Sequence, residues 1–436
     1  MGLTLLVLSA LSLASTLLVL AALARQGAAL RLDEQLRALP RPADLGGLPR
    51  VSPRPQVTIV VPVRNEERNV GPLLRALLQL DHPAFEVLLA DDASTDRTLE
   101  VAREVAGGDA RVRILDMQQV ARDERAAFKS GKAFVLAQAA REAQGEWLLF
   151  LDADTRQRPD ALWRALELCR LHGLQAFSSS GVYVNPSLWG EVLEATLYVA
   201  LFLSIPLRRV NDPADRDVGW ANGQFVLVRR DVYERLGGHG ALRAFAQDDL
   251  AIGRLFKERD VPFRFCPDGR LYECVNYVTW DEADRGWTRL VAAGTPWLGH
   301  GRPFFLRTLL LLLLSGLVPV IVCPLAWAGP WGLAAVGPVT ARALASAALG
   351  LALFLQAAVR LNMKLSLWRT VLLPVGTLLT ARVLLAAWRV RFSGAGYDLR
   401  GRTLTPDDPG LIRRELDRGD PQRGPPDPGE GAKVGA

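Results

Sequence analysis

The chain has 436 residues, of which 50% are apolar and 22% are charged, and its formal net charge is +6. That balance excludes a disordered or fibrous protein. The four cysteines form no C-x-x-C pair and have no histidine partner at zinc spacing, which argues against a disulfide scaffold or a zinc ribbon. No RNA-binding signature accompanies the positive charge, so we assign it to a membrane surface and expect no nucleic-acid partner.

The first predicted element is a transmembrane anchor in residues 1–25. Residues 3–24 carry no charge, and at about 1.5 Å per residue they are long enough to cross a hydrocarbon layer of about 30 Å. Arginines follow this segment and no basic residue precedes it. The positive-inside rule therefore predicts an N-terminus outside the cell and a basic cytoplasmic linker over residues 26–54.

From Val57 onward, short β-rich runs alternate with helical stretches, which is the pattern of an α/β sheet. The predicted strands cover 57–63, 85–92, 111–117 and 146–155, and the predicted helices cover 65–80, 94–106 and 132–143. The helix at 65–80 has acidic residues in its expected first turn, and Ser94 or Thr95 is the expected cap of the next helix. Several of the strands end in polar residues, at the edge where open α/β sheets bind ligands.

Two carboxylates follow the apolar strand WLLFL. Alternation along an extended chain would put Asp152 and Asp154 on one side, within reach of a divalent cation. Mg²⁺ or Mn²⁺ bound by one or two carboxylates also holds phosphate oxygens. Acidic residues often simply end a strand, but a second acidic strand end in the same domain favours the metal site.

Two further acidic clusters admit two interpretations each. Asp91 and Asp92, with Asp96, are either part of a binding site or a turn and N-cap pair. Asp248 and Asp249 begin a helix whose apolar spacing suits packing on the sheet, so they are either helix-start acids or the source of a general base.

The C-terminal part predicts about three transmembrane helices within residues 305–390, at 305–328, 341–359 and 370–388. Their topology is in conflict, because three spans put the tail outside, whereas four arginines after the last run favour the inside. A further span or a half-inserted helix would resolve the conflict, and residues 192–207 are a candidate. Residues 403–436, rich in Pro, Gly and Asp, read as a disordered tail.

Five segments, in order, resemble glycosyltransferase family 2: VVPVRNEERNV, VLLADDASTDRT, GKAFVLAQAAREAQGEWLLFLDADT, NGQFVLVRRDVYERLGGH and DDLAIGRLFKERD. The resemblance covers roughly residues 55–300. It implies the GT-A fold, an α/β nucleotide-binding sheet, between N-terminal and C-terminal transmembrane helices. It also implies transfer from a nucleotide-diphospho sugar with inversion at the anomeric carbon.

The resemblance implies donor-binding roles for six residues: Pro62, Arg64, Glu66, Asp92, Lys132 and Asp152. Asp92 would contact the base, and Lys132 would reach the diphosphate unless it is only a solvated helix-start lysine. Asp154 would be the direct metal ligand, with Asp152 beside it, and Asp249 would be the catalytic base. Asp248 stands where the family usually has Glu.

The acceptor is suggested by a departure from the family pattern. Processive synthases of the family carry Q-x-x-R-W after the base, whereas residues 282–294 here read EADRGWTRLVAAG. This segment, with a G-R pair at Gly401 and Arg402, is more similar to the membrane-bound branch that glycosylates lipids such as carotenoids, hopanoids or ceramide. Trp287 would be an acceptor wall or an interfacial aromatic anchor, and Asp248 is the second candidate acceptor residue.

The function expected from the sequence is therefore transfer of a hexose from a UDP-hexose to a hydroxyl or carboxyl of a membrane lipid, by a multi-pass protein of the cell membrane. A membrane polysaccharide synthase and a polyprenyl-phosphate sugar synthase of the same family are the alternatives. A non-catalytic membrane scaffold is a third, less compatible with three acidic clusters.

Overall fold

The computed structural model describes residues 2–27, 35, 39, 57–117, 122–184, 187–267, 270–275, 277–298, 300–328, 338–393, 397–399 and 402–404. The predicted basic linker (26–54) and the predicted tail (403–436) therefore lie almost entirely outside the described residues, as does Gly401.

A seven-stranded sheet forms the centre of the domain, in the order β3-β2-β1-β4-β8-β6-β9. Its strands are β1 (Val57–Val63), β2 (Phe85–Asp91), β3 (Val112–Asp116), β4 (Trp147–Phe150), β6 (Ala176–Ser179), β8 (Val226–Arg229) and β9 (Phe263–Cys266). All neighbours are parallel except β8, which runs antiparallel to both β4 and β6. Val60 is paired with Leu88 on one side and with Phe150 on the other.

Two smaller sheets accompany it. One combines β5 (Thr155–Gln157), β10 (Tyr272–Val275) and β7 (Val182–Val184), and the other pairs β11 (Tyr397–Leu399) with β12 (Arg402–Leu404). Because β5 directly follows the end of β4, the chain leaves the main sheet at the predicted Asp152–Asp154 site.

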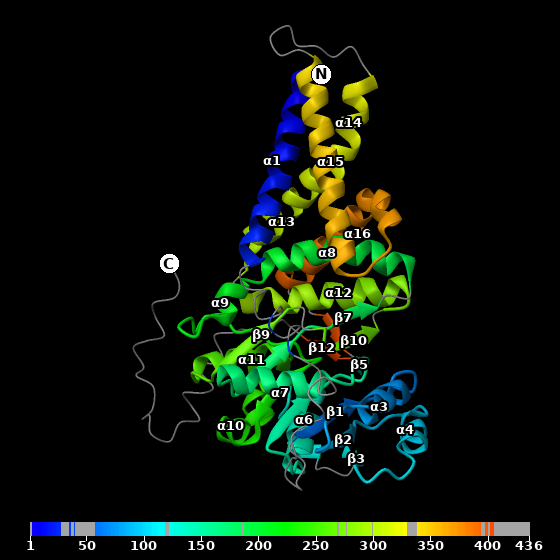
Figure 1. Ribbon diagram of the computed structural model, residues 1–436, viewed down its shortest axis with the longest axis vertical. Coiled ribbons are helices and arrows are strands. Elements are labelled where there is room, and N and C mark those ends of the chain that lie inside the picture. The colour runs from blue at the N-terminus through cyan, green and yellow to red at the C-terminus, as the bar shows by residue number, and fades with distance from the viewer. Residues whose placement is uncertain are drawn as a thin grey trace.

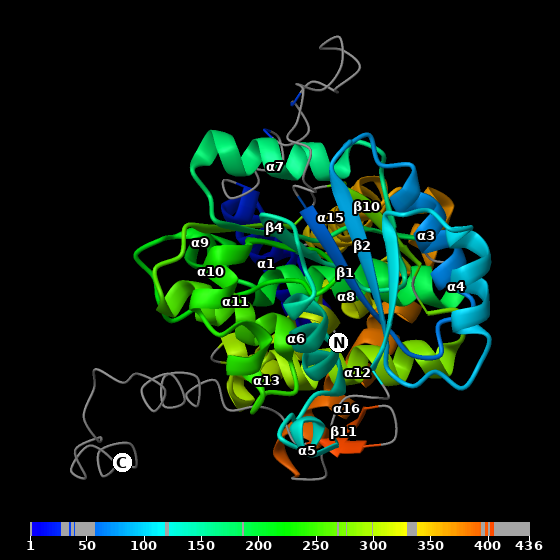
Figure 2. The same ribbon diagram turned by 90° about the horizontal axis from the view of Figure 1, so that it is seen from below.

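Helices cover both faces of the main sheet, and the alternation of apolar residues along β1 explains why. Ile59 and Val61 face one cluster of buried side chains and Val60 faces the other. The first cluster includes α3 (Val70–Leu78), α4 (Thr98–Ala106) and α7 (Ala161–His172). The second includes α6 (Gly131–Arg141), α10 (Arg230–Arg235), η4 (Gly238–Leu242) and α11 (Asp248–Glu258), and Figure 2 shows α7 and α6 on opposite sides of the strands.

Two predicted helix starts are wrong. The helix expected from residue 65 begins at Val70, because Asn65 adopts a left-handed conformation (φ 56°) and accepts a hydrogen bond from the Thr95 N–H at 2.8 Å. Its acidic residues therefore precede the helix. The helix expected from residue 94 begins at Thr98, where Asp96, and neither Ser94 nor Thr95, accepts the backbone N–H. The parallel strands β1 and β2 bring the two loops that follow them together, and side chains of these loops determine where both helices begin.

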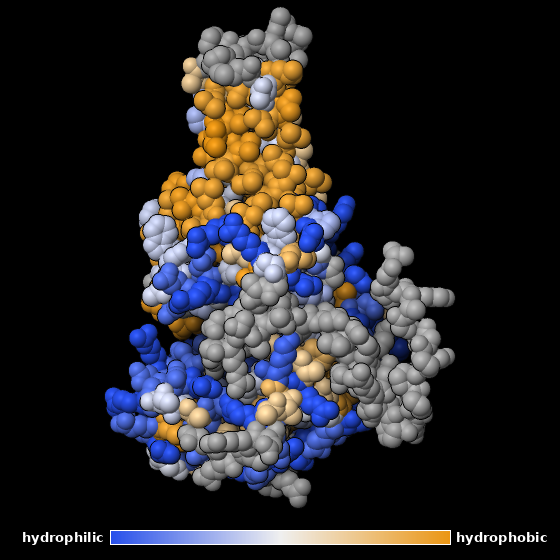
Figure 3. Space-filling view, turned by 180° about the vertical axis from the view of Figure 1, so that it is seen from behind, coloured by the Kyte–Doolittle hydropathy of each residue, from blue (hydrophilic) through white to orange (hydrophobic). Residues whose placement is uncertain are grey.

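Within the part of the chain that the structure describes, four helices are long and apolar enough to cross a membrane, judged by length and composition only: Gly2–Arg25, Arg302–Ala328, Val339–Asn362 and Leu367–Phe392. They comprise α1 (Gly2–Gly27), α13 (Arg302–Leu312) with the π-helical turn η6 (Leu313–Leu317) and α14 (Val318–Ala328), α15 (Pro338–Asn362), and η7 (Leu367–Leu372) with α16 (Leu373–Phe392). In Figure 1, α1, α14 and α15 run together as a stalk above the domain, and Figure 3 shows this stalk as an apolar column.

The last of these helices packs differently from the others. α16 contacts α8 (Leu188–Ser204) and α12 (Trp280–Gly294), which lie across the base of the stalk (Figure 1). A methyl group on Gly376 of α16 would lie 2.6 Å from the Val192 carbonyl oxygen of α8, and Arg382 forms a two-point ion pair with Asp284 of α12. Most of the candidate span at 192–207 is thus part of the buried helix α8 at the base of the apolar stalk, and α9 (Leu207–Asn211) follows it.

Candidate active site

All ten predicted site residues line one cavity of about 470 Å³ at the carboxyl ends of β1, β2 and β4: Pro62, Arg64, Glu66, Asp92, Lys132, Asp152, Asp154, Asp248, Asp249 and Trp287. The structure therefore brings together carboxylates from three strand and helix ends that are far apart in the sequence. Further cavity residues come from α8, α12 and the short helix α5 (Arg122–Ala126).

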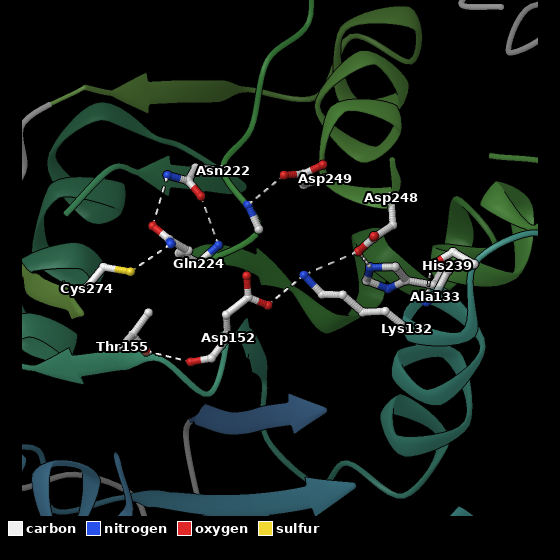
Figure 4. A network of polar contacts seen from close by, with 12 residues as sticks. Lys132, Ala133, Asp152, Thr155, Asn222, Gln224, His239, Asp248, Asp249 and Cys274 are labelled. Carbon is white, nitrogen blue, oxygen red and sulfur yellow. Dashed lines mark hydrogen bonds and ion pairs between the residues drawn. The ribbon is translucent and has the colours of Figure 1, made fainter. Parts of the chain in front are cut away.

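Asp152 and Asp154 lie in a turn after β4 rather than in the extended strand predicted for them. The Thr155 hydroxyl donates to the Asp152 carbonyl oxygen at 2.8 Å, which stabilises the turn (Figure 4). Oδ1 of Asp154 is buried without a hydrogen-bond partner. Burial and the charges of Asp152 and Glu66 raise the pKa of Asp154. A group of like charges with an unpartnered oxygen is an arrangement that a cation would stabilise.

Within the described ranges, no three His, Cys, Asp or Glu side chains are grouped so as to hold a metal ion. Two carboxylates are nevertheless enough for Mg²⁺, which binds through one or two carboxylates and keeps its other positions for water and substrate phosphates. The unpartnered Asp154 oxygen and the neighbouring Asp152 fit this kind of ligand set.

Lys132 lies in the first turn of α6, where Ser130 caps the helix by accepting the Ala133 N–H. Its Nζ is 2.6 Å from Oδ1 of Asp152 and 3.8 Å from Oδ2 of Asp248. Figure 4 draws both ion pairs as dashed lines. Burial lowers the pKa of Lys132, but these carboxylates outweigh it and raise the pKa overall. Lys132 is thus a fixed positive charge in the cavity, not a solvated helix-start lysine.

Asp248 and Asp249 begin α11, as the sequence predicts. Oδ2 of Asp249 accepts the Gly223 N–H at 3.2 Å, and its Oδ1 accepts the Leu250 N–H at 2.8 Å. Burial and the adjacent Asp248 charge raise the pKa of Asp249, while Lys132 opposes them. A carboxylate in this position is a stronger base than an ordinary aspartate.

Asp92 is 6% exposed and forms ion pairs with two arginines. Nη1 of Arg125 lies 2.5 Å from Oδ1 of Asp92, and Nη1 of Arg64 lies 3.4 Å from its Oδ2. Its neighbours Asp91 and Asp96 instead accept backbone N–H groups of Ser94 and Thr98. The acidic cluster therefore contains both the structural and the cavity-facing carboxylates that the sequence left as alternatives.

Sequence reasoning missed Arg125 and the polar network around Gln224. Arg125 lies in a five-residue helix without any distinguishing spacing, so the sequence held no usable signal for it. Gln224 donates to the Cys274 sulfur at 3.0 Å and accepts from the Tyr272 hydroxyl at 3.3 Å. Asn222 and Gln224 flank Gly223 in the segment NGQFVLV, and this pattern could have identified them as candidate site residues. Figure 4 shows both side chains in the network.

Aromatic rings form the opposite wall of the cavity. Trp287 of α12 is 3% exposed, and its ring centroid lies 5.9 Å from Tyr198, 6.1 Å from Tyr277 and 6.5 Å from Tyr183. Its indole Nε1 is buried without a hydrogen-bond partner. The cavity thus has a charged half at the sheet and an aromatic half on the side of α8 and α12.

A comparison with known protein families assigns part of the chain to a family. Residues 58–237 match the model of the family described as glycosyl transferase family 2. The chain carries a family 2 glycosyltransferase domain. The matched residues contain Pro62 to Asp154 and the Gly223 loop from the charged half of the cavity, together with Tyr183 and Tyr198 from the aromatic half. The match ends before Asp248 and Asp249.

Among curated relatives, the glycosyltransferase is 23% identical over 273 residues to a 4,4'-diaponeurosporenoate glycosyltransferase of Staphylococcus aureus, which covers 61% of this chain and 68% of the relative. Among solved structures, it is similar to a mannosyltransferase from Pyrobaculum calidifontis in complex with GDP-Man and Mn²⁺ (TM-score 0.47, 22% identity, 88% of this chain and 98% of that one). It is also similar to glucosyl-3-phosphoglycerate synthase from Mycobacterium tuberculosis (TM-score 0.36, 18% identity, 56% and 81%).

Proposed function

We propose that this glycosyltransferase transfers a hexose, with inversion, from a UDP-hexose to a hydroxyl or carboxyl group of a membrane lipid. The observation that supports the proposal best is the single cavity lined by Asp92, Asp154 and Asp249 on one side and by Trp287 on the other. The sugar donor and the lipid acceptor can therefore bind side by side in this cavity.

The donor half follows from charge. Asp92, held by Arg64 and Arg125, would contact the base, and Lys132 would face the diphosphate from its place between Asp152 and Asp248. An ammonium beside a leaving diphosphate stabilises the negative charge that develops as the glycosidic bond breaks.

A divalent cation on Asp154 and Asp152 would supply Lewis-acid stabilisation of the same leaving group. Asp249 accepts the proton of the attacking hydroxyl on the opposite side of the sugar, while the Gly223 N–H holds one of its oxygens in place. One base is sufficient for inversion, because no covalent intermediate forms.

The aromatic wall of the cavity and its position under the apolar stalk support binding of a lipid acceptor there. Trp287, Tyr198 and Leu290 line the cavity from α8 and α12, the helices that lie under the apolar stalk. The relative from S. aureus is named for a diaponeurosporenoate, a carboxylate by its name, which supports a lipid acceptor. The raised pKa of Asp249 suits a hydroxyl acceptor, which must lose a proton.

We place the catalytic domain on the cytoplasmic side of the cell membrane. The ends of the membrane helices that lie nearest the domain carry arginines, among them Arg25, Arg302, Arg307 and Arg360. The positive-inside rule assigns such ends to the cytoplasm.

The test is transfer by the detergent-purified protein, using radiolabelled UDP-glucose or UDP-galactose and a total lipid extract of the source organism. We expect a labelled lipid, and we expect Asp154→Ala and Asp249→Asn to abolish its formation. Asp231→Asn is the matched control, because Asp231 pairs with Arg229 on the surface and is remote from the cavity. Normal turnover by purified Asp249→Asn would refute the assigned base.

The product distinguishes a hydroxyl acceptor from a carboxyl acceptor, and transfer to a lipid from polysaccharide synthesis. A lipid heavier by one hexose supports the proposal, and cleavage of that hexose by mild alkali identifies an ester, hence a carboxyl acceptor. A polymer formed from donor alone would instead identify a polysaccharide synthase.

A further inference from the structure

The segment Gly237–Gly238–His239 builds a buried contact behind the cavity. Gly237 and Gly238 both have positive φ angles (77° and 51°), and a methyl group on Gly238 would lie 2.3 Å from Cζ of Tyr233. Only glycine permits this conformation with the Tyr233 ring in place. The turn brings the His239 backbone N–H to 3.0 Å from the Tyr233 hydroxyl oxygen.

The same hydroxyl determines the tautomer of His239. It accepts the His239 N–H, and it lies 2.8 Å from Nδ1 of the imidazole. The phenol proton has no other acceptor among the described residues, so we assign it to Nδ1. Burial, aided by the positive charge of Lys132, lowers the pKa of His239 to about 3, so the imidazole is neutral. Its single proton is therefore on Nε2.

Nε2 points toward Asp248. The distance to Oδ2 is 3.9 Å, and the same carboxylate oxygen is 3.8 Å from Nζ of Lys132 (Figure 4). The Phe150 ring packs edge-on against the imidazole at 4.8 Å and fixes its plane. His239 is 2% exposed, so it cannot itself contact the donor or the acceptor.

We propose that His239, locked as the Nε2–H tautomer by Tyr233, is a positioning residue that orients Asp248 and thereby holds Lys132 at the diphosphate. The chain of contacts runs from His239 through Asp248 to Lys132 and ends on Asp152. The N–H dipole attracts the Asp248 carboxylate from behind, which directs it toward Lys132 and away from the neighbouring base Asp249. This inference rests on the proposed function, because it assigns Lys132 to the donor.

The test uses the two amides that imitate the two nitrogens of histidine. An Asn side chain reaches about as far as Nδ1 and can keep the partner of Tyr233, whereas a Gln side chain reaches about as far as Nε2 and can donate to Asp248. The measurement is UDP-hexose turnover, with kcat and donor KM determined separately, on the full-length protein in detergent. We expect His239→Asn to raise the donor KM about tenfold with a small change in kcat, and His239→Gln to stay within about twofold of wild type.

A double-mutant cycle separates positioning from folding. In an Asp248→Asn background, His239→Asn should have no further effect on donor KM, because its action passes through the Asp248 carboxylate. Thermal melting of each variant is the parallel readout, and the two amides should melt within a few degrees of each other.

Two results would overturn the inference alone: equal KM losses in the Asn and Gln variants, or an undiminished effect of His239→Asn beside Asp248→Asn. A wild-type protein that neither transfers nor hydrolyses either UDP-hexose would overturn the proposed function first, and this inference with it.

Discussion

A methyl group on Gly286 would lie 2.1 Å from Cζ of Tyr277, so the ring of Tyr277 occupies the space that any side chain at position 286 would need. Gly286 precedes Trp287 in α12, and Tyr277 packs on the Trp287 ring at 6.1 Å. The glycine in the sequence G-W is therefore a packing requirement of the aromatic wall.

Gly286→Ala should displace Tyr277 and Trp287 and lower transfer to lipid by about tenfold or more, while hydrolysis of the UDP-hexose falls much less. Both activities can be measured in one assay from labelled lipid and free hexose. Gly350→Ala in α15 is the matched control, because nothing lies within 4 Å of its added methyl group. Equal losses of transfer and hydrolysis would contradict an acceptor role for this wall.

The acid side of the pH profile should report Asp249. A base works only when deprotonated, so kcat/KM falls as the pH drops through its pKa. Since burial and Asp248 raise that pKa, the fall should occur well above the value of about 3.9 typical of aspartate. Asp248→Asn removes the neighbouring negative charge and should shift this fall in kcat/KM to lower pH. If kcat/KM of that variant falls at the same pH as in the wild type, Asp249 is excluded as the titrating group.

Asp154 should limit stability when no metal is present. The pKa of Asp154 is raised in the folded state, so the ionised carboxylate destabilises the fold. This destabilisation is absent at a pH below the unfolded-state pKa and grows as the pH rises from there to the folded-state pKa. We expect Asp154→Asn to raise the melting temperature in chelator, by the equivalent of about 1–3 kcal/mol, and more at pH 8 than at pH 5.

Metal addition provides the complementary measurement. Mg²⁺ or Mn²⁺ should raise the melting temperature of the wild type but not that of Asp154→Asn, because only a binding-competent fold gains from the ion. Equal stabilisation of both proteins would place the ion elsewhere.

Lys132 offsets three carboxylates, those of Asp152, Asp248 and Asp249. Lys132→Gln should therefore reduce turnover at least tenfold and lower the melting temperature at pH 8, with a smaller effect at pH 5, where Asp249, whose pKa is raised, carries less negative charge. Arg97→Gln removes an exposed pair with Glu100 and is the control for loss of one charge. A loss of stability that is the same at both pH values would refute this electrostatic role.

The packing of α16 predicts the side on which the chain continues. α16 contacts α8 and α12 through Gly376 and the Arg382–Asp284 pair. It also contacts α13 and η6, whereas the stalk in Figure 1 consists of α1, α14 and α15. We therefore expect α16 to lie at the cytoplasmic interface without crossing, which also agrees with the basic residues Arg389 and Arg391 at its end. A fluorescent protein fused after residue 436 should fluoresce, and a fused alkaline phosphatase should be inactive. The opposite pair of results would show that α16 spans.

Local sequence patterns were enough to predict most of the sheet and the apolar helices. Two-residue alternation and uninterrupted apolar runs depend only on neighbours in the chain, and the strands at 57–63, 85–91 and 112–116 lie within one residue of prediction. The order of the five segments likewise follows from the sequence alone, and the family comparison confirms the family that they indicate.

Contacts between distant segments were decided only by the tertiary structure. The turn at Asn65 depends on Thr95, Asp92 pairs with Arg125 of a helix too short to have a pattern, and His239 matters only because Tyr233 and Asp248 flank it. The hydropathy of α16 is that of a transmembrane helix, yet α8 and α12 pack against it in addition to α13 and η6. Apolarity along the chain determines that a segment avoids water, but whether lipid or protein covers it depends on the partners that folding brings against it.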